Sequence, residues 1–103
     1  MQKTLGIMVA TKDHMAHVLG IAHAARKAGI HTDIFFTGDG VRLTQDIQFS
    51  KLINTANRVG ICEVSFRHFG YKKELLSGLT DKDFATQARN ANMIQNCDRY
   101  IVL

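Results

Sequence analysis

The sequence has no proline, no tryptophan, no low-complexity tract and only two cysteines among its 103 residues. Because 46% of the residues are hydrophobic, the composition is that of a folded domain and excludes a disordered segment. No apolar run approaches the roughly 20 residues that span a bilayer. The apolar stretch near the start meets Lys12-Asp13 too soon for a signal peptide. Two cysteines without a disulfide-rich pattern fit a reducing compartment, so we expect a cytoplasmic protein without a membrane partner.

The net charge of the chain is also small. Thirteen basic and nine acidic side chains give a net charge of +4, and the lysines and arginines are scattered along the chain. Nucleic-acid-binding surfaces cluster their cations on one face and add stacking aromatics, so the sequence predicts no nucleic-acid partner. The length and the absence of a linker predict a single domain over residues 1–103.

Strand-like and helix-like apolar patterns alternate along the chain. Continuous apolar runs predict strands, and apolar residues at helical spacing predict helices. The expected strands are 5–10, 31–36, 59–64 and 100–103; the expected helices are 14–28, 43–57, 65–76 and one starting at Thr80-Asp81-Lys82-Asp83. This order predicts an α/β fold, a small three-layer sandwich with a mostly parallel sheet of four to five strands. Its edges need protection, and self-association would provide it.

Cys62 is the strongest candidate for chemistry. It lies near the carboxyl end of the strand 59–64, the end at which ligands gather in open α/β sheets. A helix starting near Ser65, together with Arg67, would favour the reactive thiolate. His68, six residues after the cysteine, is a candidate activating base. The alternative is a buried cysteine that only fills space, and local physics leaves both open.

A glycine-containing segment follows the second expected strand. Gly38 and Gly40 allow close approach of the backbone to a ligand or another chain, and the amides there could hold an anion. The dinucleotide-binding fingerprint is incomplete, because position 43 is Leu43. A tight turn between strand and helix is the favoured interpretation.

Two histidines and the second cysteine are weaker candidates. His14 and His17 are three residues apart at a helix start, but a metal site needs three or four ligands, so we expect an exposed surface there. Cys97 precedes the last strand and therefore lies at the opposite end of the sheet from Cys62. The distance between the two ends of a strand argues against a disulfide between them, and we expect Cys97 to be structural.

Three segments, in order, resemble the DsrE/DsrF-like family, which includes the TusBCD sulfur-relay subunits. They are Phe35-Phe36-x-x-x-Gly40-Val41, then Ile61-Cys62-x-x-Ser65 with Gly70-Tyr71, and finally Asp98-Arg99-Tyr100-Ile101-Val102. Each is weak alone, but their order and spacing make the combination specific. The resemblance covers essentially the whole chain.

The resemblance implies a small α/β domain that assembles as a homotrimer or homohexamer. It also implies that Cys62 accepts sulfur as a persulfide and passes it on, with Ser65 and Gly70 shaping its loop. The chain departs from the family pattern at Phe69, where basic residues are common, and Arg67 and His68 are the candidates to replace them. The expected lining residues of the site are Phe36, Gly38, Gly40, Ser65, Arg67, His68 and Gly70.

Three functions follow as hypotheses. The first is a sulfurtransferase-like relay protein that carries sulfur on Cys62 between donor and acceptor proteins. It needs no metal or organic cofactor. The second is an oligomeric module that binds a small ligand or a protein at residues 38–41. The third is a redox-sensing thiol protein.

Overall fold

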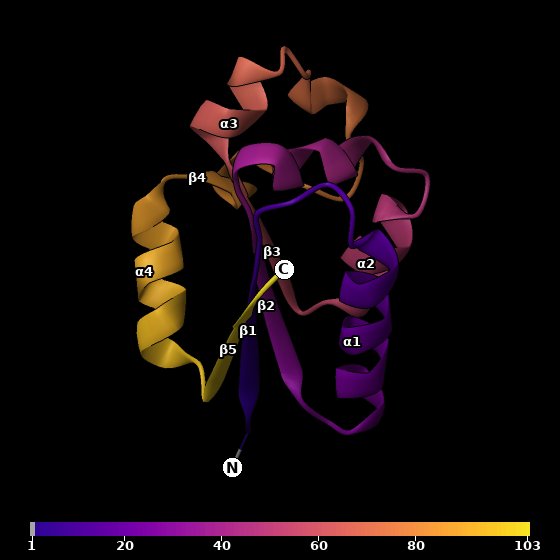
Figure 1. Cartoon of the computed structure of the whole chain (residues 1–103), viewed down its shortest axis with the longest axis vertical. Helices are drawn as coiled ribbons and strands as arrows, with labels where there is room; N and C mark the ends of the chain where they lie inside the picture. The colour runs from indigo at the N-terminus through magenta and orange to yellow at the C-terminus, as the bar shows by residue number, and fades with distance from the viewer. Residues whose placement is uncertain (1) are drawn as a thin grey trace.

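The centre of the molecule is a sheet of five parallel strands in the order β4-β3-β2-β1-β5 (Figure 1). The computed structural model describes residues 2–103, except for the side chain of Leu75. The strands are β1 Thr4–Val9, β2 His31–Phe36, β3 Arg58–Cys62, β4 Phe84–Ala85 and β5 Arg99–Val102. The sequence prediction of an α/β fold with a parallel sheet is confirmed.

Helices cover both faces of the sheet and form the two outer layers of the sandwich. α1 (Met15–Lys27) and α2 (Phe49–Thr55) lie on one face, and α4 (Gln87–Asn96) lies on the other (Figure 1). α3 (Glu63–His68) and the 3-10 helix η1 (Gly38–Gln45) lie beyond the carboxyl ends of the strands. Two single 3-10 turns, η2 (Lys73–Leu75) and η3 (Asp81–Asp83), complete the described helices.

Burial on both faces explains the continuous apolar runs of the strands. Phe36 belongs to the larger core cluster under α1 and α2, where its ring meets Phe49 edge to face at 5.6 Å between centroids. Phe35, its neighbour in β2, belongs to a separate cluster with Cys62 and Met93 of α4. Successive side chains of a strand point to opposite faces, so one strand supplies both cores.

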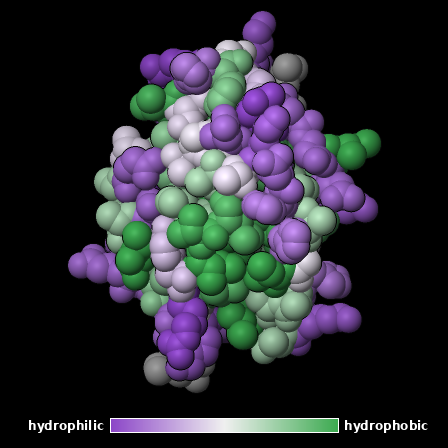
Figure 2. Space-filling view, viewed as in Figure 1, coloured by the Kyte–Doolittle hydropathy of each residue, from purple (hydrophilic) through white to green (hydrophobic). Residues whose placement is uncertain are grey.

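One face of the molecule carries an exposed apolar patch. Figure 2 shows it near the centre of the view, where Figure 1 shows the edge strand β5. Val102 of β5 is 54% exposed, and Ile101 and Leu103 are only partly buried against the core. β5 pairs with β1 on one side, so its other edge is open within the described chain.

Two predicted helices have the wrong boundaries. The helix expected over 65–76 is the shorter α3, which begins at Glu63, directly after β3 ends at Cys62. It stops at His68 because the chain turns at Gly70 with φ 73°. The helix expected over 43–57 is two separate pieces. Asp46 between them is extended (φ −75°, ψ 141°), and its carboxylate accepts a hydrogen bond from the Gln48 amide at 2.8 Å.

The region after residue 80 also differs from the prediction. Thr80 is a helix cap, as expected, but it caps only η3, in which Thr80 and Asp83 bond reciprocally. Phe84–Ala85 then pairs with β3 as the short strand β4, which the sequence analysis did not identify. A second cap, Thr86, begins α4 by accepting a hydrogen bond from the Ala88 amide. The helix expected from residue 80 therefore begins at Gln87.

Candidate functional site

Cys62 is the last residue of β3 and directly precedes α3. η1 follows the carboxyl end of the neighbouring strand β2, so Cys62 and η1 lie at the same end of the sheet. The Ser65 hydroxyl of α3 accepts a hydrogen bond from the Gly38 amide of η1 at 3.0 Å. The structure therefore brings together two segments, the cysteine loop and the glycine-containing segment, that are 27 residues apart in the sequence.

The environment of Cys62 favours its thiolate. Burial raises the pKa of the thiol, but hydrogen bonds from the Ser65 hydroxyl and amide, the Thr37 hydroxyl and the Val64 amide lower it. The balance places the pKa of Cys62 below its ordinary value. Donors that bond a charged group stabilise the charged form, so the thiolate is the form that this site accommodates best.

Both hydroxyl groups are oriented by a second contact. The Thr37 hydroxyl oxygen accepts a hydrogen bond from the Gln87 side-chain amide at 2.7 Å, as the Ser65 oxygen does from Gly38. A hydroxyl has a single hydrogen, and a nitrogen donor on its oxygen leaves that hydrogen for another acceptor. In both residues this hydrogen is free to point at the sulfur of Cys62, whose pKa the two hydroxyls lower.

Gly40 fixes the position of η1 against the sheet. A Cβ atom on Gly40 would collide with the carbonyl oxygen of Val9 and lie 2.6 Å from its carbonyl carbon. The Gly40 amide also donates to the Thr37 carbonyl at 2.9 Å. This close backbone approach, which only glycine allows, holds Thr37 beside the cysteine.

Arg67 and His68 lie on the exposed side of α3. Arg67 is 3.3 Å from the carboxylate of Glu63, and Lys73 donates to the same carboxylate at 2.7 Å. Lys73, by its hydrogen bond and its charge, and more weakly Arg67 lower the pKa of Glu63. The His68 ring packs edge to face on Phe69, with 5.1 Å between centroids. Among the described residues, the groups that lower the pKa of Cys62 include neither Arg67 nor His68.

The wall of the site on the sheet side is formed by Phe35 rather than Phe36. Phe36 is fully buried in the larger core on the opposite face, whereas Cys62 belongs to the smaller cluster with Phe35 and Met93, against which Ala85 and Tyr100 pack. Cys62 is only 5% exposed in the single chain. The side chain of Cys62 is therefore nearly covered in the single chain.

Sequence reasoning missed three contributors to the site. Thr37 directly follows β2, so the rule that ligands gather at the carboxyl ends of strands would have found it. Phe35 would have followed from the alternation of side chains along β2. Gln87 lies 50 residues from its partner Thr37, and no local pattern in the sequence indicates that contact.

The remaining candidates lie elsewhere. The rings of His14 and His17 are 5.5 Å apart, and within residues 2–103 no group of three or more potential metal ligands forms around them. Cys97 lies before β5 and donates weakly to the Ile94 carbonyl, and both cysteines are free thiols. Cys97 also packs against Gly6, where an added Cβ atom would lie 3.0 Å from its sulfur.

No helix within residues 2–103 has the length and apolar character needed to cross a membrane.

Comparison with known proteins identifies the family. A comparison with curated proteins gave no match. The sequence model of the DsrE/DsrF-like family, in contrast, matches residues 5–103, which is essentially the whole chain and includes the Cys62 loop and every strand except the first residue of β1. The chain therefore belongs to the DsrE/DsrF-like family.

Proposed function

We propose that this protein is a sulfur-relay protein that carries sulfur as a persulfide on Cys62. The observation that supports this proposal most directly is the set of donors around the sulfur, two hydroxyls and two backbone amides, at the carboxyl end of β3. The family is generally linked to sulfur relay. Thiolate stabilisation is the property that a sulfur carrier needs, because the thiolate is the nucleophile.

The proposed reaction has two thiol exchange steps. In the first, the Cys62 thiolate attacks the outer sulfur of a donor persulfide. A new S–S bond forms on Cys62, the donor's S–S bond breaks, and the donor leaves as a thiolate. In the second, an acceptor thiolate attacks the outer sulfur of the Cys62 persulfide and releases the Cys62 thiolate. The transferred sulfur keeps its oxidation state, so neither step needs an oxidant, a reductant or a cofactor.

The same hydrogen bonds serve both steps. In loading they raise the fraction of thiolate, and in unloading they stabilise the thiolate that leaves. A leaving thiol with a lower pKa departs faster in thiol exchange. Ser65 and Thr37 are therefore proposed as positioning residues, with Gly38, Gly40 and Gln87 holding their hydroxyls in place.

We further propose a cytoplasmic homotrimer or homohexamer that exchanges sulfur with donor and acceptor proteins. The exposed apolar patch at β5 supports self-association, because an open edge strand with exposed apolar side chains is a surface that proteins usually cover (Figure 2).

A second function is favoured by the burial of Cys62. At 5% exposure, and packed with Phe35 and Met93, the cysteine also fits a structural role in the smaller core cluster. The protein would then be a binding module that uses residues 38–41, and Cys62 would take no part in its activity. The two functions differ in one measurable property, the ability of Cys62 to accept sulfur.

The test is persulfide loading followed by intact-mass spectrometry. The parent protein, Cys62→Ser and Cys97→Ser are each incubated with glutathione persulfide. We expect the parent and Cys97→Ser to gain the mass of one sulfur atom on Cys62 and to pass it to an added thiol. Cys62→Ser should remain folded, with a loss on the order of 1 kcal/mol, and should not load. Loading of Cys62→Ser equal to the parent, or an unmodified Cys62 in folded parent protein, would assign the function to the binding module.

A further inference from the structure

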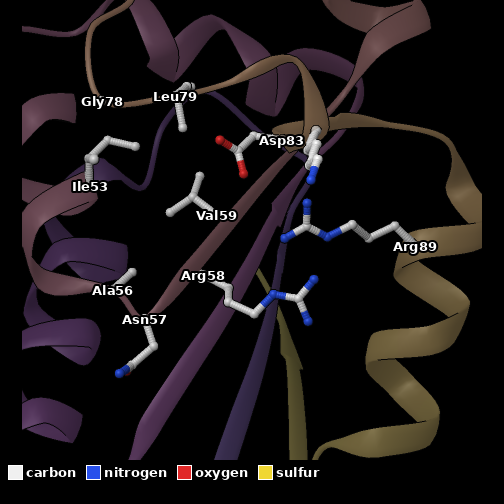
Figure 3. A pocket seen from close by; sticks show the side chains of 10 residues that line it. Ile53, Ala56, Asn57, Arg58, Val59, Gly78, Leu79, Asp83 and Arg89 are labelled. Atoms are coloured by element: carbon white, nitrogen blue, oxygen red, sulfur yellow. The ribbon is translucent and has the colours of Figure 1, made fainter.

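A pocket of about 240 Å³ lies at the outer edge of β3, at the end of the strand opposite to Cys62 (Figure 3). β4 pairs only with Ile61 and Cys62, so within the described chain residues 58–60 have no strand neighbour on that side. The pocket occupies this open edge. Its lining residues are Ile53, Ala56, Asn57, Arg58, Val59, Gly78, Leu79, Lys82, Asp83 and Arg89.

The charged residues of the pocket are mostly cations. Arg58, Lys82 and Arg89 face a single carboxylate in the lining, that of Asp83. An oxygen of this carboxylate already accepts hydrogen bonds from the Thr80 amide at 2.7 Å and the Thr80 hydroxyl at 3.3 Å. This carboxylate is therefore held by the η3 cap, and the lining carries three cationic side chains against one anionic one.

The Arg89 side chain lies in a space that exists because residue 60 is glycine. Its side chain extends from α4 across β3, and a Cβ atom on Gly60 would lie 2.7 Å from the carbon of its guanidinium group. The side chain is only 15% exposed. Its Nε is buried and has no hydrogen-bond partner among the residues that the structure describes. A buried, unpaired donor is costly unless another group satisfies it.

The carboxylate of Asp33 lies near both arginines but leaves most of their N–H donors unused. One oxygen is 3.8 Å from Arg58 and the other is 3.8 Å from Arg89. These distances are well beyond the roughly 2.7–2.9 Å of a charge-assisted hydrogen bond. Burial raises the pKa of Asp33, and the two arginine charges offset part of this effect. The guanidinium groups are thus anchored on one side while their N–H donors stay available on the other.

The opposite wall of the pocket is apolar. In Figure 3 the side chains of Ile53, Val59 and Leu79 lie on the side away from Arg89, while Arg58 and Arg89 extend toward each other. An apolar wall with a few convergent charged groups is the usual construction of a site for a small organic ligand. A guanidinium group binds two oxygens of one carboxylate or phosphate through parallel N–H donors.

We propose that this pocket binds a small organic anion, with a carboxylate or phosphate head between Arg58 and Arg89 and an apolar body against Ile53, Val59 and Leu79. The site is separate from the thiol, because Val59 is three residues before Cys62 in an extended strand, or about 10 Å away. It does not depend on sulfur chemistry at Cys62.

The test is isothermal titration calorimetry with three probes: phenyl phosphate, benzoate and inorganic phosphate. We expect saturable binding at one site per chain, and tighter binding of an aromatic probe than of inorganic phosphate. The comparison of phenyl phosphate with benzoate identifies the preferred head group. Absence of saturable binding for all three probes would overturn the proposal, and equal affinity for phenyl phosphate and inorganic phosphate would overturn the role of the apolar wall.

Variants separate a positioned arginine from general positive charge. Arg89→Gln should weaken binding of the better aromatic probe by about tenfold or more, the effect of losing a charge-assisted hydrogen-bonded pair. Gly60→Ala keeps every charge but displaces the Arg89 guanidinium, and it should weaken binding comparably.

The matched control is Arg99→Gln, which makes the same charge change in β5, the opposite edge strand. It should bind like the parent. If Arg99→Gln weakens binding as much as Arg89→Gln, or if Gly60→Ala binds like the parent, the site is not the one proposed. Circular dichroism verifies the fold of each variant. Arg58→Gln, at a side chain that is 65% exposed, replaces Arg89→Gln should the latter unfold.

Discussion

The contact between Gly40 and β1 allows a sharp test of how the cysteine site is held. In Gly40→Ala the new Cβ atom would lie 2.6 Å from the carbonyl carbon of Val9, whereas ordinary van der Waals contact begins at 3.4 Å. The neighbour is backbone in a central strand and cannot rotate away, so η1 must move by roughly 1 Å, an overpacking change that costs about 1–3 kcal/mol. If the movement also breaks the bond from Gly38 to Ser65, the loss grows by about 1 kcal/mol.

The assay is urea unfolding of parent and variant, with the thermal midpoint as a second measurement. A total loss of about 2–4 kcal/mol would lower the Tm by roughly 10 °C or more in a chain of this size. The displaced Thr37 should also donate less well to Cys62, so the pKa of the thiol should rise toward its ordinary value. Alkylation of Cys62 at a series of pH values measures this change.

The chain provides a matched control in Gly20→Ala. Gly20 lies within α1 and an added Cβ atom there meets nothing within 4 Å. Alanine is the better helix former, so this variant should be more stable than the parent by about 0.5–1 kcal/mol. Equal stability of Gly40→Ala and the parent, or a loss as large in Gly20→Ala, would refute the reasoning from close backbone approach.

Further predictions concern the thiols and the assembly. Ser65→Ala removes a donor to the thiolate, so the pKa of Cys62 should rise; an unchanged pH midpoint of alkylation would contradict the assigned bond. Under native conditions Cys62 should react with iodoacetamide faster than Cys97, as measured by comparing Cys97→Ser with Cys62→Ser; equal rates would argue against the site. Because the pKa of Cys62 is lowered in the folded state, the stability that its thiolate adds should be fully present above the unfolded pKa and disappear as the pH falls through the folded pKa. The stability difference between the parent and Cys62→Ser in urea should follow that change. Light scattering should show a homotrimer or homohexamer, and a monomer of 11.5 kDa would rule this out.

The elements that were predicted correctly are those with a strong local signal. β1 and β2 are continuous apolar runs, and α1 shows apolar residues at helical spacing closed by Gly29. β4 has only two residues, Phe84 and Ala85, and its existence depends on pairing with β3 more than 20 residues earlier. Such a contact leaves no periodic pattern in the sequence, so the local pattern predicts a helix at these two residues instead of a strand.

The candidate site was also predictable only where its sequence signal is local. The position of Cys62 at a strand end was predictable, because the pattern around it is local. Gly38 and Ser65 were both named as lining residues, yet the bond that joins them emerges only from the fold. The sequence distance predicts Arg67 and His68 close to the thiol, but α3 begins two residues earlier than predicted and directs them to solvent. A shift of two residues in a helix start rotates every following side chain by more than half a turn.

The place of β1 between β2 and β5 has a consequence for folding kinetics. The Thr4 amide donates to the Asp98 carboxylate across 94 residues of sequence, and four residues of β1 pair with β5. Such distant pairings raise the contact order, and proteins of high contact order fold slowly. Until β5 docks, one edge of β1 stays open to other chains in a partly folded molecule. Refolding should therefore depend on protein concentration, with aggregates competing most strongly before the sheet is complete.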